Sequence, residues 1–188
     1  MGPGSGFACD VRLNTALTPD QRRTYQDPDL IREILEKTRT VAIVGLSVDH
    51  QKASYFVASY LKSEGYRIIP VTPRRGTILG EETRPTLRDV LEPVDLVDVF
   101  RPVQELQGLA EDTIAIGAKY FWAQLRIIDF AAAEKARGAG LKVVLDKCVK
   151  MEHARHRGSL HWAGMNTEIV TARRKTPGGF IDSVGNVP

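Results

Sequence analysis

The stretch Val41-Ala-Ile-Val-Gly-Leu-Ser47 decides the fold. Its first four residues are all apolar, which is typical of a strand buried on both faces of a parallel sheet. Gly45 then permits a tight turn or the close approach of another group. Beyond a short polar loop, apolar residues recur at helical spacing, at Phe56, Val57, Tyr60 and Leu61. A strand, a glycine turn and a helix N-terminus place unpaired N–H groups around one loop, so the segment predicts a phosphate-binding loop.

Short apolar runs and helical patterns alternate along the rest of the chain. Strands are predicted at 41–44, 66–71, 94–99, 118–122 and 142–145. Helices are predicted after the Asp27-Pro28 pair and at 53–64, 86–91, 102–116 and 129–137. This alternation predicts a Rossmann-like, doubly wound α/β fold with a parallel sheet of about five strands.

The 188 residues suffice for one domain with tails. Residues 1–26 lack strong periodicity and are predicted to be a mobile segment, 27–155 to be the folded domain, and 156–188 to be a basic C-terminal extension. Residues 150–188 hold six basic and three acidic side chains, a difference equal to the whole net charge of +3. The run Arg173-Arg-Lys175 is typical of an exposed terminal segment, and no helix-turn-helix pattern accompanies it, so no nucleic-acid partner is expected.

Hydropathy argues against a membrane partner, because the sequence has no run of eighteen apolar residues. The N-terminus lacks the apolar core of a signal peptide, and a cytoplasmic location is therefore expected. Two cysteines, Cys9 and Cys148, do not make a disulfide framework in a chain of this length.

Cys148 follows the last predicted strand and has a lysine beside it. A nearby lysine favours the thiolate, so a nucleophile or a mixed-disulfide partner for a thiol ligand is one interpretation. A small buried thiol is the simpler one, since free cysteine is commonly part of the core. His153, His156 and His161 lie nearby in sequence, but their spacing is not that of a zinc finger, so no metal is expected.

Ligands of doubly wound sheets bind beyond the carboxyl ends of the strands, where the winding direction reverses. If the first strand is central, its neighbours are the strand that ends at Val71 and the strand that ends at Phe100. Four segments are therefore expected to converge on one crevice: Gly45–Ser54, Val71–Arg75, Phe100–Arg101 and Phe121–Leu125.

The loop after the first strand does not identify its nucleotide, because it contains neither G-x-G-x-x-G nor G-K-[ST]. The end of the second strand is more informative. An NAD site usually has an acidic residue there to bind the ribose hydroxyls. The sequence Pro70-Val-Thr-Pro-Arg-Arg75 has no acid and two arginines, which suit a phosphate on the ribose. NADP and coenzyme A (CoA) both carry such a phosphate.

The sequence resembles the family of small CoA-binding proteins, whose domain is related to the N-terminal CoA-binding domain of the succinyl-CoA synthetase α subunit. The resemblance covers about residues 28–155. It rests on Val41-Ala-Ile-Val-Gly-Leu-Ser47, Ser54-Tyr55, Gly65-Tyr-Arg-Ile-Ile-Pro-Val71, Ile78-Leu-Gly80, Val94-Asp-Leu-Val-Asp-Val-Phe-Arg101, Gly117-Ala-Lys119, Trp122-Ala-Gln-Leu125 and Asp146-Lys-Cys148. Two segments depart from the family pattern: Val71-Thr-Pro73 replaces V-N-P, and Trp122-Ala-Gln-Leu-Arg126 replaces W-x-Q-x-G.

The resemblance implies three groups of CoA-binding residues. The pyrophosphate would meet Gly45, Ser47, Lys52 and Ser54. The adenosine and its 3′-phosphate would be bordered by Val71, Pro73 and Arg74. The pantetheine arm would pass Phe100, Arg101 and Gln124. Leu46 and Thr72 belong to the same segments and complete the predicted binding residues.

The expected function is binding of CoA or an acyl-CoA by a non-catalytic carrier, sensor or accessory subunit. An NADP-binding oxidoreductase or a redox sensor is the first alternative, although the chain lacks G-x-G-x-x-G and an evident proton-transfer group. A subunit of an acyl-CoA ligase-type enzyme is the second alternative. The partners considered are therefore CoA itself, a second copy of the chain, and an acyl-CoA-handling enzyme.

Overall fold

The computed structural model describes residues 16–157, and the compact unit that holds the sheet spans Thr15–Glu152. The predicted basic extension lies outside the described residues from position 158 onward. Five parallel strands pair in the order β2-β1-β5-β6-β7. They are β1 (Thr40–Val44), β2 (Arg67–Val71), β5 (Leu96–Val99), β6 (Tyr120–Ala123) and β7 (Lys142–Val144). The predicted parallel sheet of about five strands is confirmed.

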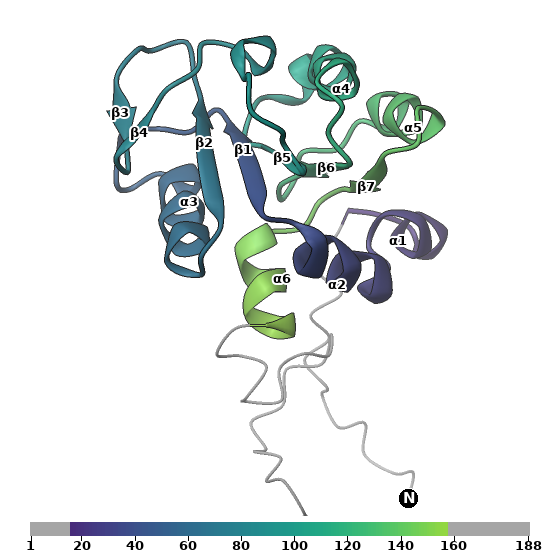
Figure 1. Ribbon diagram of the computed structural model, residues 1–188. Coiled ribbons are helices and arrows are strands. Elements are labelled where there is room, and N and C mark those ends of the chain that lie inside the picture. Colours follow the sequence, from purple (N-terminus) through teal and green to yellow (C-terminus); the bar gives the residue numbers. More distant parts are fainter. Residues whose placement is uncertain (1–15, 158–188) are drawn as a thin grey trace, which may run out of the picture. The chain divides into compact units, whose positions relative to one another are not determined.

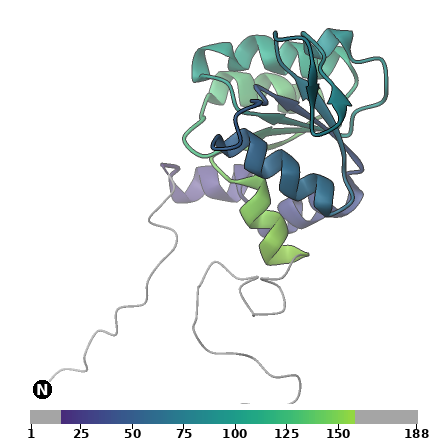
Figure 2. The same ribbon diagram turned by 90° about the vertical axis from the view of Figure 1, so that its left-hand side faces the viewer.

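Helices cover both faces of this sheet, as a doubly wound fold requires. Helices α4 (Leu106–Ala115) and α5 (Phe130–Gly138) lie on one face, and α2 (Pro28–Lys37) and α3 (Ala53–Ser63) lie on the other (Figure 1). The view in Figure 2 shows the sheet between the two helical layers. Asp27 and Asp129 cap the helices that follow them, because each side chain accepts backbone N–H at the start of its helix.

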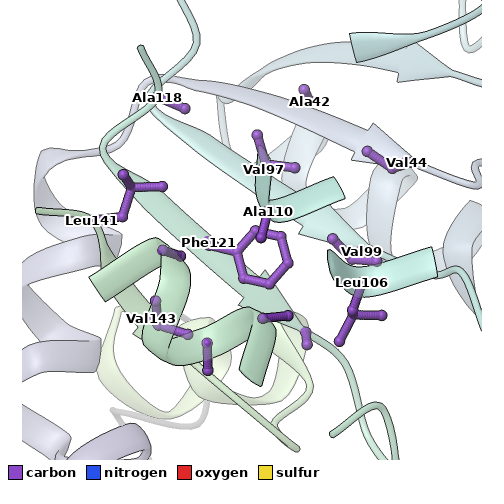
Figure 3. Packing of buried hydrophobic residues seen from close by; sticks show 14 of the residues in the cluster. Ala42, Val44, Val97, Val99, Leu106, Ala110, Ala118, Phe121, Leu141 and Val143 are labelled. Carbon is purple, nitrogen blue, oxygen red and sulfur yellow. The ribbon is translucent and has the colours of Figure 1, made fainter. Parts of the chain in front are cut away.

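Each face has its own apolar core. Val97 and Val99 of β5 point toward α4 and α5, whereas Leu96 belongs to the core beneath α2 and α3. Figure 3 shows Phe121 among Val97, Val99 and Ala110. The burial follows from the strand's period of two, which sends alternate side chains to opposite faces. We refer below to the α4 face and the α3 face of the sheet.

The predicted helix over 86–91 is wrong. The chain forms only a 3₁₀ turn, η2 (Leu87–Asp89), closed by the Asp89 carboxylate, which accepts from both the N–H and the hydroxyl of Thr86. Val90 is already extended, and Pro93 follows shortly, so the turn does not propagate. The helix predicted at 102–116 likewise starts as a 3₁₀ turn, η3 (Val103–Glu105), before α4 begins.

Four elements were not predicted: α1 (Pro19–Tyr25), the short strands β3 (Thr77–Ile78) and β4 (Glu81–Glu82), and α6 (Val149–His156). Helix α1 lies within the segment expected to be mobile. It begins with a capping box, in which Thr18 and Gln21 bond each other's backbone N–H. Tyr25 is buried and donates its hydroxyl to Glu134 of α5, which anchors the end of α1.

Candidate functional site

The carboxyl ends of β2, β1 and β5 lie side by side. Val44, the last residue of β1, pairs with both Val71 and Val99. The chain goes from β1 to β2 on one side and later enters β5 on the other, so the winding direction reverses at β1. The predicted central position of the first strand is therefore confirmed, and the loops that follow these three strands start at neighbouring points.

Gly45 is in close contact with the ends of both neighbouring strands. Its φ of 86° lies in the left-handed region, and its N–H donates to the Val71 carbonyl over 2.8 Å. A Cβ at this position would lie 2.9 Å from Cδ of Arg101 and 3.0 Å from the Phe100 carbonyl oxygen. Both the backbone conformation and the packing therefore require glycine, as the sequence indicated.

The loop between Gly45 and α3 is held by its own hydrogen bonds. The Ser47 N–H donates to Ser54 Oγ over 3.2 Å, and the Asp49 N–H donates to Ser47 Oγ over 3.1 Å. The Gln51 N–H donates to Asp49 Oδ1 over 2.9 Å. Side chains of the loop thus engage several of its backbone donors, and the adjoining helix N-terminus supplies the further donors for an anion.

The N-terminus of α3 carries a cation and has no acidic residue in its first turn. Lys52 occupies the N-cap position and makes no side-chain capping bond. Serine, threonine, aspartate or asparagine normally caps a helix, and a cation at this end opposes the helix dipole. A residue that is unfavourable for the helix but attractive to anions is consistent with a phosphate site at this end of the crevice.

On the other side of Gly45 the crevice deepens into a cavity of about 180 Å³. Five predicted residues line it: Gly45, Val71, Thr72, Pro73 and Arg101. The remaining lining residues were missed, and they are Val44, Pro85, Thr86, Leu87, Glu105, Leu109 and Asp112. Leu87 belongs to η2, Leu109 and Asp112 belong to α4, and Glu105 ends η3 just before α4. The Pro85-Thr86 pair, which lies within the connection between β2 and β5, was the signal that could have found part of this wall.

The other predicted residues lie away from the cavity. Ser47, Lys52 and Ser54 belong to the loop on the α3 side, where Ser54 is largely buried. Leu46 is 2% exposed and packs in the core of the α3 face. The remaining ones are Arg74, which is exposed beyond β2, and Phe100 and Gln124, which follow β5 and β6.

Asp98 was missed, although it is the most unusual polar residue near the site. It is completely buried on β5 between Ile43 and Trp122 of the neighbouring strands. Gln124 Nε2 donates to Oδ1 of Asp98 over 2.7 Å, and Oδ2 has no partner among the described residues. Burial raises the pKa of Asp98 to about 7, against the opposing effect of the Gln124 hydrogen bond. Its position in an apolar strand run was the only available signal.

Cys148 is partly buried and packs against the core of the α3 face. Burial raises the pKa of its thiol, and the nearby Asp98 raises it further, whereas backbone hydrogen bonds oppose these effects. A raised pKa keeps the sulfur protonated and unreactive near neutral pH. No group of three histidine, cysteine or acidic side chains that could hold a metal occurs within residues 16–157, and His161 lies outside them.

No helix within residues 16–157 is both long and apolar enough to cross a membrane. The fold is that of a Rossmann-like α/β protein, with a cavity beside the point where the strand order reverses.

Residues 39–154 match the sequence model of the CoA binding domain, and the chain belongs to this family. The Bacillus subtilis (strain 168) protein YneT is 36% identical over 124 residues, which cover 66% of this chain and 92% of YneT. The crystal structure of Prb, a PH1109 protein redesigned for binding, has a TM-score of 0.68 and 32% identity, and the match covers 70% of this chain and 92% of Prb. The Thermus thermophilus protein cell-free ID.343 has a TM-score of 0.66 and 32% identity, with coverage of 69% and 98%.

Proposed function

We propose that the protein binds CoA or an acyl-CoA in this crevice, as a non-catalytic carrier, sensor or accessory subunit. The observation that carries the proposal is the family match, because residues 39–154 include every segment that borders the crevice. The high pKa of the Cys148 thiol supports a binding role over a nucleophilic one.

The cavity on the α4 side suits the adenosine. Its volume of about 180 Å³ is below the roughly 300–1,000 Å³ typical of a complete small-molecule site, so it takes one part of an extended ligand. Val71, Pro73 and Leu87 supply apolar walls, and Thr72 and Thr86 supply hydroxyl groups. A flat, uncharged base with polar edges fits such a lining better than a phosphate does.

The phosphates belong at the positive ends of the crevice. Lys52 and the N-terminus of α3 would bind the pyrophosphate, and Arg74, just beyond the cavity wall at Pro73, would bind the 3′-phosphate. Phe100 and Gln124 would then border the pantetheine arm, since they follow the next two strands of the sheet.

Calorimetric titration with CoA and with dephospho-CoA tests this assignment. Dephospho-CoA is expected to bind roughly ten- to a hundredfold more weakly, because it forgoes one charge-assisted contact of about 1.5–3 kcal/mol. Arg74→Gln should remove that preference, and Arg75→Gln is the control with the same change in charge. Absence of heat from CoA with the folded protein would refute the proposal.

NADP binding is the second candidate, and one observation favours it. The segment after β2, Thr72-Pro-Arg-Arg75, lacks the acid of an NAD site and would suit a 2′-phosphate as well as a 3′-phosphate. Titration with NADPH in competition with CoA separates the two. Displacement of bound NADPH only at a large excess of CoA would reverse the ranking.

The accessory role implies a partner, either a second copy of the chain or a subunit of an acyl-CoA ligase-type enzyme. Light scattering of the purified protein measures self-association. Affinity purification from the source cells followed by mass spectrometry is expected to recover an enzyme that handles acyl-CoA. Recovery of the protein alone, as a monomer, would exclude the accessory role and favour the carrier role.

A further inference from the structure

An ion pair occupies the crevice where its two sides meet. Arg101 donates from Nε to Glu105 Oε2 over 2.8 Å and from Nη2 to Oε1 over 2.7 Å. Both side chains line the cavity. Two parallel hydrogen bonds to one carboxylate are the geometry in which a guanidinium also binds phosphate.

Arg101 is well placed to meet a phosphate. Its Cδ would lie only 2.9 Å from a Cβ on Gly45, so its aliphatic stem packs directly over the glycine between the loop and the cavity. Under the proposed function, the pyrophosphate links an adenosine in the cavity to the rest of CoA and must pass this point. The predicted role of Arg101, lining the pantetheine path, then moves to the phosphates.

The charge of Arg101 is nevertheless already neutralised. Among the described residues that line the cavity, Arg101 is the single basic side chain, against the two acids Glu105 and Asp112. Asp112 accepts a hydrogen bond from Arg88 over 2.5 Å, which leaves Glu105 as the acid directed at Arg101. A phosphate that approaches Arg101 therefore has to replace the Glu105 carboxylate.

Within residues 16–157, the Glu105 side chain has no hydrogen-bond or ion-pair partner other than Arg101. It is the N-cap residue of α4, but its side chain makes no capping hydrogen bond. Its contribution to the helix is therefore limited to the general attraction between an acid and the helix N-terminus. Replacing it with glutamine keeps the size of the side chain and removes the charge.

We propose that Glu105 is an internal competitor for Arg101: it holds the guanidinium in the ligand-free protein and yields it to a phosphate of the ligand. The inference rests on the proposed function for the identity of that ligand. Its consequence is selectivity. CoA compensates the lost ion pair by burying adenosine in the cavity, whereas a free inorganic anion cannot.

Calorimetry on a double-mutant cycle tests the inference. Glu105→Gln is expected to bind CoA roughly two- to fivefold more tightly than the wild type, the range that an exposed ion pair of this kind supports. Arg101→Gln should weaken binding roughly tenfold or more, and adding Glu105→Gln to it should give no further gain. Glu111→Gln is the matched control, because it removes one acid from the same helix at a residue outside the cavity lining.

Equal gains from Glu105→Gln with and without Arg101 would overturn the inference, because the glutamate would then act by general repulsion. Weaker or unchanged binding in Glu105→Gln would overturn it as well. Thermal unfolding of each variant checks that the fold is intact.

Inorganic pyrophosphate provides an arm that does not depend on CoA. At low salt, Glu105→Gln is expected to bind it at least twofold more tightly than the wild type, and only when Arg101 is present. If CoA fails to bind any variant while this preference holds, the proposed function fails and the competition stands. If pyrophosphate binds both proteins equally, or neither, the competition is refuted.

Discussion

The two sides of the crevice differ in hydrogen bonding, in charge and in the space that they leave open. On the α3 side, the loop side chains bond the loop's own backbone, Lys52 adds positive charge, and the buried acid Asp98 lies on the sheet face beneath. On the α4 side, apolar side chains leave an open cavity, and its one arginine is neutralised by Glu105. The α3 side offers charge and the α4 side offers space. An extended ligand with an anionic part and a flat, uncharged part fits both.

The largest expected effect concerns the buried acid of the α3 side. Because burial raises the folded pKa of Asp98 to about 7, the folded protein holds this proton more tightly than the unfolded chain does. The contribution of Asp98 to the free energy of unfolding is fully present at low pH. It is lost as the pH rises from about 4, the pKa in the unfolded chain, to about 7. Over that range the wild type should lose about 3 kcal/mol of unfolding free energy relative to Asp98→Asn.

Urea unfolding of both proteins at a series of pH values measures this difference. Phe121→Ala on the α4 face is the control: it should cost about 3–5 kcal/mol at every pH, because it creates a cavity and removes no titrating group. If the difference in unfolding free energy between the wild type and Asp98→Asn stayed constant from pH 4 to pH 7, the proton binding of this acid would not differ between the folded and unfolded states in this range.

The next effect tests the point where both sides meet. Gly45→Ala combines a left-handed φ with contacts of 2.9 and 3.0 Å, and we expect a loss of about 2 kcal/mol or more in stability and of more than tenfold in CoA affinity. Gly117→Ala has a similar φ of 70° and nothing within 4 Å of the new Cβ. It should cost about 1 kcal/mol and leave CoA affinity unchanged. If the two variants bound CoA with similar affinity, Gly45 would not be part of the binding site.

The smallest expected effect tests whether the α3 side, and not the α4 side, binds the pyrophosphate. Lys52→Gln is expected to weaken CoA binding about three- to tenfold at low salt, since it removes one phosphate contact. The same change should raise the melting temperature slightly, because the lysine opposes the dipole of α3. Affinities of the two proteins should converge in high salt. A salt-independent difference, or none, would place the pyrophosphate away from α3.

The loop on the α3 side and the strand ends could be predicted from the sequence, whereas the part of the cavity wall that η2 and α4 contribute could not. Gly45, the loop and the start of α3 form one continuous segment whose strand, turn and helix patterns are local. The cavity needs η2 and α4 to fold over the sheet end, and apolar periodicity does not specify which turn of a helix closes over a crevice. Leu87 and Leu109 therefore read as ordinary core residues.

Two further misses have different causes. Helix α1 carried a readable signal, because Thr18-Pro-Asp-Gln21 has the capping-box spacing. Asp98 carried almost none, since Val94-Asp-Leu-Val-Asp-Val99 contains two acids and does not reveal which of them is buried. Its burial depends on the register of β5 between β1 and β6, which is a property of the sheet.

A crystal structure of the protein with CoA tests the central claim most directly. We predict the adenine ring in the cavity between Pro73 and Leu87, the pyrophosphate at the N-terminus of α3, and Arg101 turned from Glu105 to a phosphate. Adenine bound outside that cavity, or no CoA at saturating concentration in crystals with an open crevice, would contradict the account.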